Sequence, residues 1–135
     1  MLKRVDELLE GNVNFALETT LATKSYKNKI LYAQQHNFKV ILLYFWLPNV
    51  NSAIERVKIR VSEGGHNIET DVIKRRYSAG IKNLFNIYMP IADEVMVFDN
   101  INDEPELIVA KKIEEELTVL NIEKFNQLKQ QLNEN

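Results

Sequence analysis

Apolar and polar residues follow two spacings along this chain, one typical of helices and one typical of strands. Residues 1–10 place apolar side chains on one helical stripe, which Gly11 ends. Residues 13–17 alternate apolar with small or polar side chains and predict a short strand. Helical spacing returns at Tyr26, after Thr23 or Ser25 as cap, and ends at His36 and Asn37.

The strongest strand signal covers residues 38–46, where aliphatic and aromatic side chains follow one another without alternation. Such a run is typical of a central parallel strand that is buried on both faces. Pro48 ends the strand because proline lacks a backbone N–H. Residues 92–99 predict a further apolar strand, which leads into a polar loop at 100–105.

Two helices are predicted between these strands, and Gly64-Gly65 joins them. Asn49 or Asn51 can cap the first helix, which covers 52–61. The second helix covers 72–88, with Asp71 as its cap and Pro90 at its end.

This helical pair carries four arginines on the two sides of the glycines. Arg56 and Arg60 lie one turn apart on the first helix, and Arg75 and Arg76 lie on the second. The pattern therefore predicts a hinged basic arm.

The last quarter of the chain predicts two weaker helices, at 109–117 and 122–132. Strands that alternate with helices favour an α/β domain with a parallel sheet of about three strands flanked by helices. Ligands of such sheets bind beyond the carboxyl ends of the strands. We therefore expect Glu18, Thr20 and the basic arm at one edge.

Composition excludes several classes of protein. The 135 residues are 45% hydrophobic and 27% charged, which fits one ordinary domain. A net charge of -2 argues against general nucleic-acid binding. With no cysteine, disulfides, thiolate metal sites and thiol nucleophiles are excluded, and His36 and His66 lack a third metal ligand. No apolar run is long enough to span a membrane and the N-terminus lacks a secretory signal, so we expect the cytoplasm.

Five short segments follow one another along the chain: FALETTL at 15–21, VILLYFWL at 40–47, ERVKIRV at 55–61, GGHNI at 64–68 and KRRY at 74–77. Together they resemble the zeta toxin family of P-loop kinases, most closely its zeta toxin-like or AAA-type ATPase members. The resemblance implies an incomplete P-loop NTPase-type three-layer sandwich over residues 1–117, with a lid at 56–77 and a helical tail at 118–135. It implies ATP and Mg²⁺ as cofactors. The implied partners are ATP, a small-molecule acceptor, and an antitoxin or a complementing chain, with no nucleic acid or membrane.

One part of the family pattern is missing. Family members carry a glycine-rich loop ending Gly-Lys-Ser/Thr, which cradles the nucleotide phosphates and binds magnesium. None of the four glycines here is followed by Lys-Ser or Lys-Thr. In the family's sheet, the strand leading to that loop lies between those that resemble residues 13–17 and 38–45. We therefore expect either that these two strands pair directly or that another chain fills the gap, and we expect low stability of the chain alone.

The resemblance implies that Glu18 and Thr20 contact the phosphate acceptor, and that His66 contacts a phosphate or the substrate. The residues by themselves leave other roles open. Glu18 and Thr20 can cap the following helix, and His66 can satisfy local backbone groups.

The resemblance implies that Arg60 and Arg76 clamp the ATP phosphates and offset charge on the transferred phosphoryl group. Arg75 is an equal candidate for the role given to Arg76. Guanidinium suits this role because its planar fork binds two oxygens and stays charged. The alternative is a solvated helix face whose arginines pair with Glu55, Glu63 or Glu69.

The sequence leaves two functions open. The first is the C-terminal part of an ATP-dependent kinase that phosphorylates a small-molecule hydroxyl, which in the family is the 3-hydroxyl of UDP-N-acetylamino sugars. Because the phosphate loop is missing, we expect this chain to be inactive alone. The second is a truncated or degenerate family member that keeps a nucleotide- or protein-binding surface without catalysis.

Overall fold

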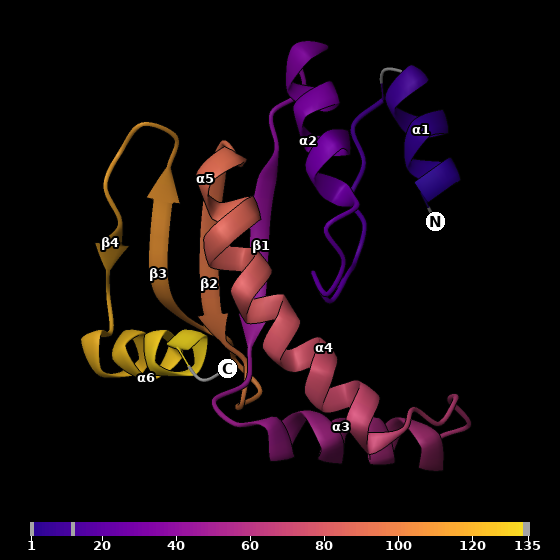
Figure 1. Cartoon of the computed structure of the whole chain (residues 1–135), viewed down its shortest axis with the longest axis vertical. Coiled ribbons are helices and arrows are strands. Elements are labelled where there is room, and N and C mark those ends of the chain that lie inside the picture. The colour runs from indigo at the N-terminus through magenta and orange to yellow at the C-terminus, as the bar shows by residue number, and fades with distance from the viewer. Residues whose placement is uncertain (1, 12, 134–135) are drawn as a thin grey trace.

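The computed structural model describes residues 2–11 and 13–133 and shows helices packed on one four-stranded sheet (Figure 1). The helices are α1 (Leu2–Glu10), α2 (Tyr26–Gln35), α3 (Val50–Ser62), α4 (Thr70–Asn83), the π-helical turn η1 (Leu84–Tyr88), α5 (Met89–Ile91) and α6 (Ile122–Asn133). The strands are β1 (Ile41–Trp46), β2 (Glu94–Asp99), β3 (Glu106–Lys112) and β4 (Thr118–Val119). The predicted α/β class is confirmed.

The sheet is mixed, with the strand order β1-β2-β3-β4. Strands β1 and β2 are parallel, with Ile41 opposite Glu94 and Trp46 opposite Asp99. Strands β3 and β4 are added in antiparallel fashion. The sheet therefore has one parallel pair, instead of the parallel set of about three strands that the sequence predicted.

The run α4–η1–α5 crosses in front of β1 and β2 in Figure 1 and supplies much of the core. Ile81, Leu84 and Tyr88 are fully buried there. The predicted long helix is confirmed, although its last turns widen into η1 and it continues through Pro90 to Ile91. Pro90 lies in the three-residue α5, directly after η1.

The predicted caps are confirmed for one helix of the arm only. Asn49 caps α3, because its Oδ1 accepts the Ser52 backbone N–H at 2.9 Å. Glu69 occupies the cap position of α4 and makes no side-chain cap bond, so the prediction of Asp71 as cap was wrong. Asp71 lies instead in the first turn, where a carboxylate favours the helix dipole.

Two predicted elements take another form. Residues 13–17 form no strand, because no neighbouring strand pairs with them; Phe15 packs edge-on against Phe38 instead, with ring centroids 6.3 Å apart. The helix predicted at 109–117 is also wrong. Its first residues belong to β3, which buries Ile108 and Val109 and pairs with β2.

Strand β1 is the edge of the sheet and is not buried on both faces as predicted. Trp46 is 1% exposed, whereas Ile41, Leu43 and Phe45 are 50%, 46% and 49% exposed. In the part of the chain that the structure describes, β1 pairs with β2 alone and nothing pairs with its outer edge.

Helix α6 packs on the sheet through buried Phe125 and Leu128. Its Gln131 accepts hydrogen bonds from Trp46 Nε1 at 2.9 Å and from the Tyr77 hydroxyl at 3.0 Å, and donates to Pro48 O at 2.6 Å. These contacts join α6 to the end of β1 and to α4.

Lys124 of α6 adds an ionic contact. Its Nζ lies 2.7 Å from both Asp99 Oδ2 and Glu106 Oε1. The approach to Asp99 Oδ2 is poorly aligned for a hydrogen bond, so this contact is best described as an ion pair. Among the described residues, no helix is both long and apolar enough to cross a membrane.

Candidate functional site

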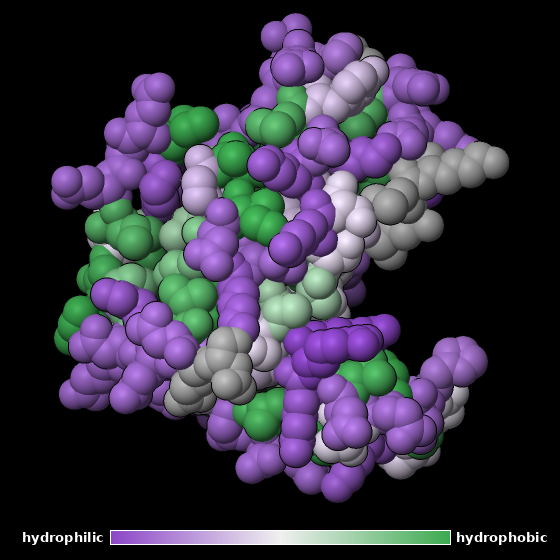
Figure 2. Space-filling view, viewed as in Figure 1, coloured by the Kyte–Doolittle hydropathy of each residue, from purple (hydrophilic) through white to green (hydrophobic). Residues whose placement is uncertain are grey.

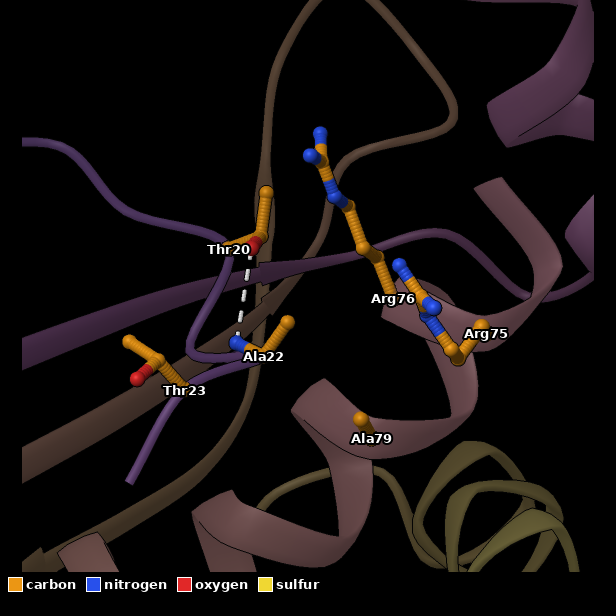
Figure 3. Close-up of a pocket in the computed structure, with 6 residues that line it drawn as sticks. All are labelled: Thr20, Ala22, Thr23, Arg75, Arg76 and Ala79. Carbon is orange, nitrogen blue, oxygen red and sulfur yellow. Dashed lines mark hydrogen bonds between the residues drawn. The ribbon is translucent and has the colours of Figure 1, made fainter. Parts of the chain in front are cut away.

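An open pocket of about 400 Å³ lies between α4 and the segment of residues 18–23, which we call the strap. Its lining residues are Thr20, Ala22 and Thr23 from the strap and Arg75, Arg76 and Ala79 from α4 (Figure 3). Figure 2 shows the molecule hollowed on its right-hand side, between the upper part with α1 and α2 and the lower part with α3. Hydrophilic side chains edge this hollow.

The strap is fixed to α4 and η1 by buried polar contacts. Asn83, which is almost fully buried, donates from Nδ2 to Leu21 O at 2.6 Å, and the Tyr88 hydroxyl donates to Thr23 O. Burial raises the pKa of Tyr88, which keeps its hydroxyl a donor at neutral pH. Leu21 is buried with φ of 59°, a conformation that non-glycine residues rarely adopt. The strap is therefore held in one conformation before any ligand arrives.

Gly80 lets α4 approach the strap closely. A Cβ atom at Gly80 would lie 2.6 Å from Thr20 O and 3.2 Å from the Tyr44 hydroxyl. No side chain fits there without moving the backbone of the strap. Burial, and then the nearby Tyr77, raise the pKa of Tyr44, so a neutral phenol lies beneath Thr20.

The hydroxyl of Thr20 is oriented by the strap itself. Thr20 Oγ1 accepts the Ala22 backbone N–H at 3.4 Å, which is the dashed line in Figure 3. A hydroxyl that accepts in this way keeps its own proton for a further partner. Thr20 can therefore donate to a ligand oxygen in the pocket.

Arg75 and Arg76 supply positive charge on the α4 side of the pocket (Figure 3). In the described part of the chain, no carboxylate lies within ion-pair distance of either guanidinium group. The ion pairs that the sequence left open with Glu55, Glu63 or Glu69 are not formed there, and Glu55 pairs with Lys58 at 3.5 Å. Among the described residues, the two cations of the pocket therefore have no ion-pair partner.

The other three residues singled out from the sequence lie outside this pocket. Glu18 is exposed at the start of the strap, and His66 is exposed in the loop between α3 and α4. Arg60 is exposed in the last turn of α3, where its carbonyl accepts the Gly65 N–H at 2.8 Å. A Cβ on Gly65 would lie 2.6 Å from Arg60 Cγ, so this glycine packs directly on the Arg60 side chain.

Sequence reasoning missed the residues that shape the pocket. Ala22, Thr23 and Ala79 line it, and Asn83 and Tyr88 hold its strap. One signal was present, since a glycine inside a helical pattern, here residue 80, commonly marks close packing.

The lining sets the chemistry that the pocket can perform. Two guanidinium groups and a hydroxyl suit an anion with several oxygens, such as a phosphate group. The described lining contains no carboxylate and no imidazole, so it offers no general base and no charged ligand for a hard cation. Groups of three or more potential metal ligands are likewise absent among the described residues.

Comparison with known proteins identifies no family and no function for the chain. No family model and no solved structure matches the chain. An uncharacterized protein of Haemophilus influenzae strain Rd is 33% identical over 69 residues. That match covers 51% of this chain and 49% of the relative, so the similarity spans about half of each protein.

Proposed function

We propose that the pocket between the strap and α4 binds the phosphate groups of a nucleotide, and that the chain is the lid-bearing part of a zeta toxin-like kinase. One observation carries the proposal: Thr20, Arg75 and Arg76, three residues to which the resemblance gives roles at phosphates or acceptor, line one pocket. The two arginines meet no carboxylate in the described structure, which leaves their charge available to a ligand.

The way in which the pocket is held supports tight binding of an anion. Asn83 and Tyr88 already fix the strap, so little ordering of the backbone accompanies binding. Hydrogen bonds to charged groups contribute about 1.5–3 kcal/mol each. Loss of both guanidinium groups therefore lowers affinity by about 100-fold or more.

The resemblance also accounts for the open edge of β1. In a P-loop NTPase-type three-layer sandwich, the strand that leads to the phosphate loop would lie beside β1, where Ile41, Leu43 and Phe45 are half exposed. In this proposal the chain binds nucleotide phosphates but does not transfer them alone, because the sequence contains no Gly-Lys-Ser/Thr loop. The residues of the pocket fit the phosphates of ATP; they do not fit Mg²⁺, and we assign no metal to them.

Calorimetric titration of the purified chain with ATP and with pyrophosphate tests the proposal. We expect binding by the wild type and a loss of about 100-fold or more in the double variant Arg75→Gln/Arg76→Gln. Lys74→Gln is the matched control, because Lys74 is an exposed cation on the same helix and does not line the pocket. Equal ATP affinity in the double variant and the wild type would refute the site.

Catalysis is tested separately with radiolabelled ATP and UDP-N-acetylglucosamine. We expect no labelled sugar nucleotide from the chain alone. Transfer that disappears in Arg60→Ala would contradict the non-catalytic part of the proposal and would make Arg60 part of a working lid.

A further inference from the structure

Strand β1 presents an edge whose backbone groups are arranged for another strand. Val40 O accepts the Glu94 N–H at 3.2 Å and Trp46 O accepts the Asn100 N–H at 2.8 Å, so the backbone of these two residues faces β2. In a strand of a parallel pair, the backbone N–H and C=O groups of one residue point to one side of the strand, and those of the next residue point to the other side. Ile41, Leu43 and Phe45 therefore direct their N–H and C=O groups to the open edge.

The side chains of the same three residues are apolar and about half exposed. Phe45 stacks on Phe98 of β2, with ring centroids 5.2 Å apart, and so extends an apolar surface across the sheet face. Edge strands of monomeric proteins are commonly protected by charged residues, proline or a bulge. The six residues of β1 contain no charge and no proline, and its pairing with β2 is regular.

We propose that β1 pairs with β1 of a second copy of this chain, in antiparallel orientation about a two-fold axis at Leu43. Only a register that keeps each side chain on its own face of the sheet is acceptable, because a slip by one residue reverses the faces. Centred on Leu43, that register places Leu43 opposite Leu43 of the second copy and Ile41 opposite Phe45. All three outward-facing residues then exchange N–H and C=O hydrogen bonds.

Charge favours a second copy as the occupant. A two-fold contact brings each residue close to residues of the identical strand, so a charged strand would meet its own charge. In this register Lys39, the charged residue nearest to β1, falls opposite Leu47 of the second copy, and like charges do not meet. Cross-strand aromatic–aliphatic pairs such as Phe45 with Ile41 contribute roughly 0.2–1 kcal/mol each.

The size of the contact sets its strength. Standard interfaces bury about 800 Å² on each partner, and one short strand with three half-exposed side chains offers less. The dimer is therefore reversible, and its population rises with protein concentration. The contact does not involve the phosphate pocket. It uses the same edge of β1 beside which the proposed function places a phosphate-loop strand, so the two pairings exclude each other.

Sedimentation velocity and light scattering from micromolar to submillimolar concentration test the proposal. We expect a monomer–dimer equilibrium for the wild type and a monomer for Leu43→Lys, because the two introduced ammonium groups meet at the axis. Val119→Lys is the matched control on β4, at the opposite edge of the sheet, where Val119 is 37% exposed. A wild type that stays monomeric throughout, or a dimer that Val119→Lys disrupts and Leu43→Lys leaves intact, would overturn the proposal.

Cross-linking gives a second measurement that does not rely on a lysine in a strand. The chain has no cysteine, so Leu43→Cys introduces a single thiol at the proposed axis. We expect a short bifunctional maleimide to link Leu43→Cys into covalent dimers and to leave Val119→Cys monomeric. The same yield of dimer from both variants, or none from Leu43→Cys, would overturn the proposed register.

Discussion

The helices α3 and α6 lie at the same end of β1, yet they are held in opposite ways. Helix α3 buries no residue completely, whereas α6 buries Phe125 and Leu128 and bonds to β1 and α4 through Gln131. The basic side chains of α6 and α4 also differ in their ion pairs. Lys124 of α6 meets two carboxylates, while Arg75 and Arg76 of α4 meet none in the described residues. Helix α6 thus stabilises the fold, whereas the exposed arginines on α4 stay available to a ligand.

The largest expected effect tests this contrast in packing. Leu128→Ala removes a side chain of α6 that is 0% exposed and leaves a cavity, so we expect the free energy of unfolding to fall by about 2–5 kcal/mol. Ile59→Ala in α3 is the control, because Ile59 is 56% exposed and should change stability by less than about 0.5 kcal/mol. Urea denaturation followed by fluorescence of the single tryptophan, Trp46, measures both. Similar losses in the two variants would contradict the contrast.

A smaller effect is expected where α4 meets the strap. Gly80→Ala places a methyl group against Thr20 O and forces the strap away from α4. Overpacking of this kind costs about 1–3 kcal/mol, which exceeds the gain of up to about 1 kcal/mol from replacing glycine in a helix. We expect a lower urea midpoint together with weaker ATP binding.

Gly11→Ala is the control for that measurement. A Cβ on Gly11 would lie 3.4 Å or more from its nearest neighbours, so both the urea midpoint and ATP binding should stay unchanged. A Gly80→Ala variant that binds ATP as the wild type does would show that the position of the strap does not matter to the pocket.

The smallest effect concerns the paired charges at α6. Hydrogen bonds from Lys124, and then from Asn121, lower the pKa of Glu106 below its ordinary value of 4.5. A lowered pKa in the folded state stabilises the protein above the unfolded value, and this contribution is lost as pH falls through the folded value. We expect Glu106→Gln to lower the urea midpoint slightly at pH 7 and to leave it unchanged at pH 3. Glu104→Gln, at an exposed position nearby, should behave as the wild type at both values.

The sequence correctly predicted those elements that local features, such as the spacing of apolar residues or a capping side chain, are enough to specify. Helices around residues 26–35, 50–62 and 122–133 were found from apolar spacing, and Asn49 was found from its chemistry as a cap. The strands were predicted less accurately, because whether a segment forms a strand depends on the strands that pair with it. Residues 13–17 alternate as a strand does but have no partner, and the apolar run of β1 does not reveal that one edge is open.

The helix expected at 109–117 failed for a related reason. Its lysines and glutamates favour a helix locally, whereas pairing with β2 and burial of Val109 hold residues 106–112 in a strand.

The pocket was predictable in part. The sequence placed Thr20 and the arginines at one edge, and Thr20, Arg75 and Arg76 line one pocket. The strand at 13–17 on which the placement of Thr20 rested does not form, and Arg60 lies outside the pocket. The contacts that fix this pocket join residues far apart in the chain, such as Asn83 with Leu21. Local sequence patterns carry no information on such pairs, except where glycine at position 80 indicates close packing.

The π-helical turn η1 affects the rotation of α4, which carries Arg75 and Arg76, relative to α5. A π-turn accommodates one residue more than an α-helical turn, and each residue of an α-helix advances by about 100°. Leu84 and Tyr88 anchor η1 in the core, so the helix before it is rotated relative to the helix after it. In evolutionary terms, a single inserted codon can give the helix this turn. Its removal would re-aim Arg75 and Arg76 by about a quarter of a turn without altering either arginine.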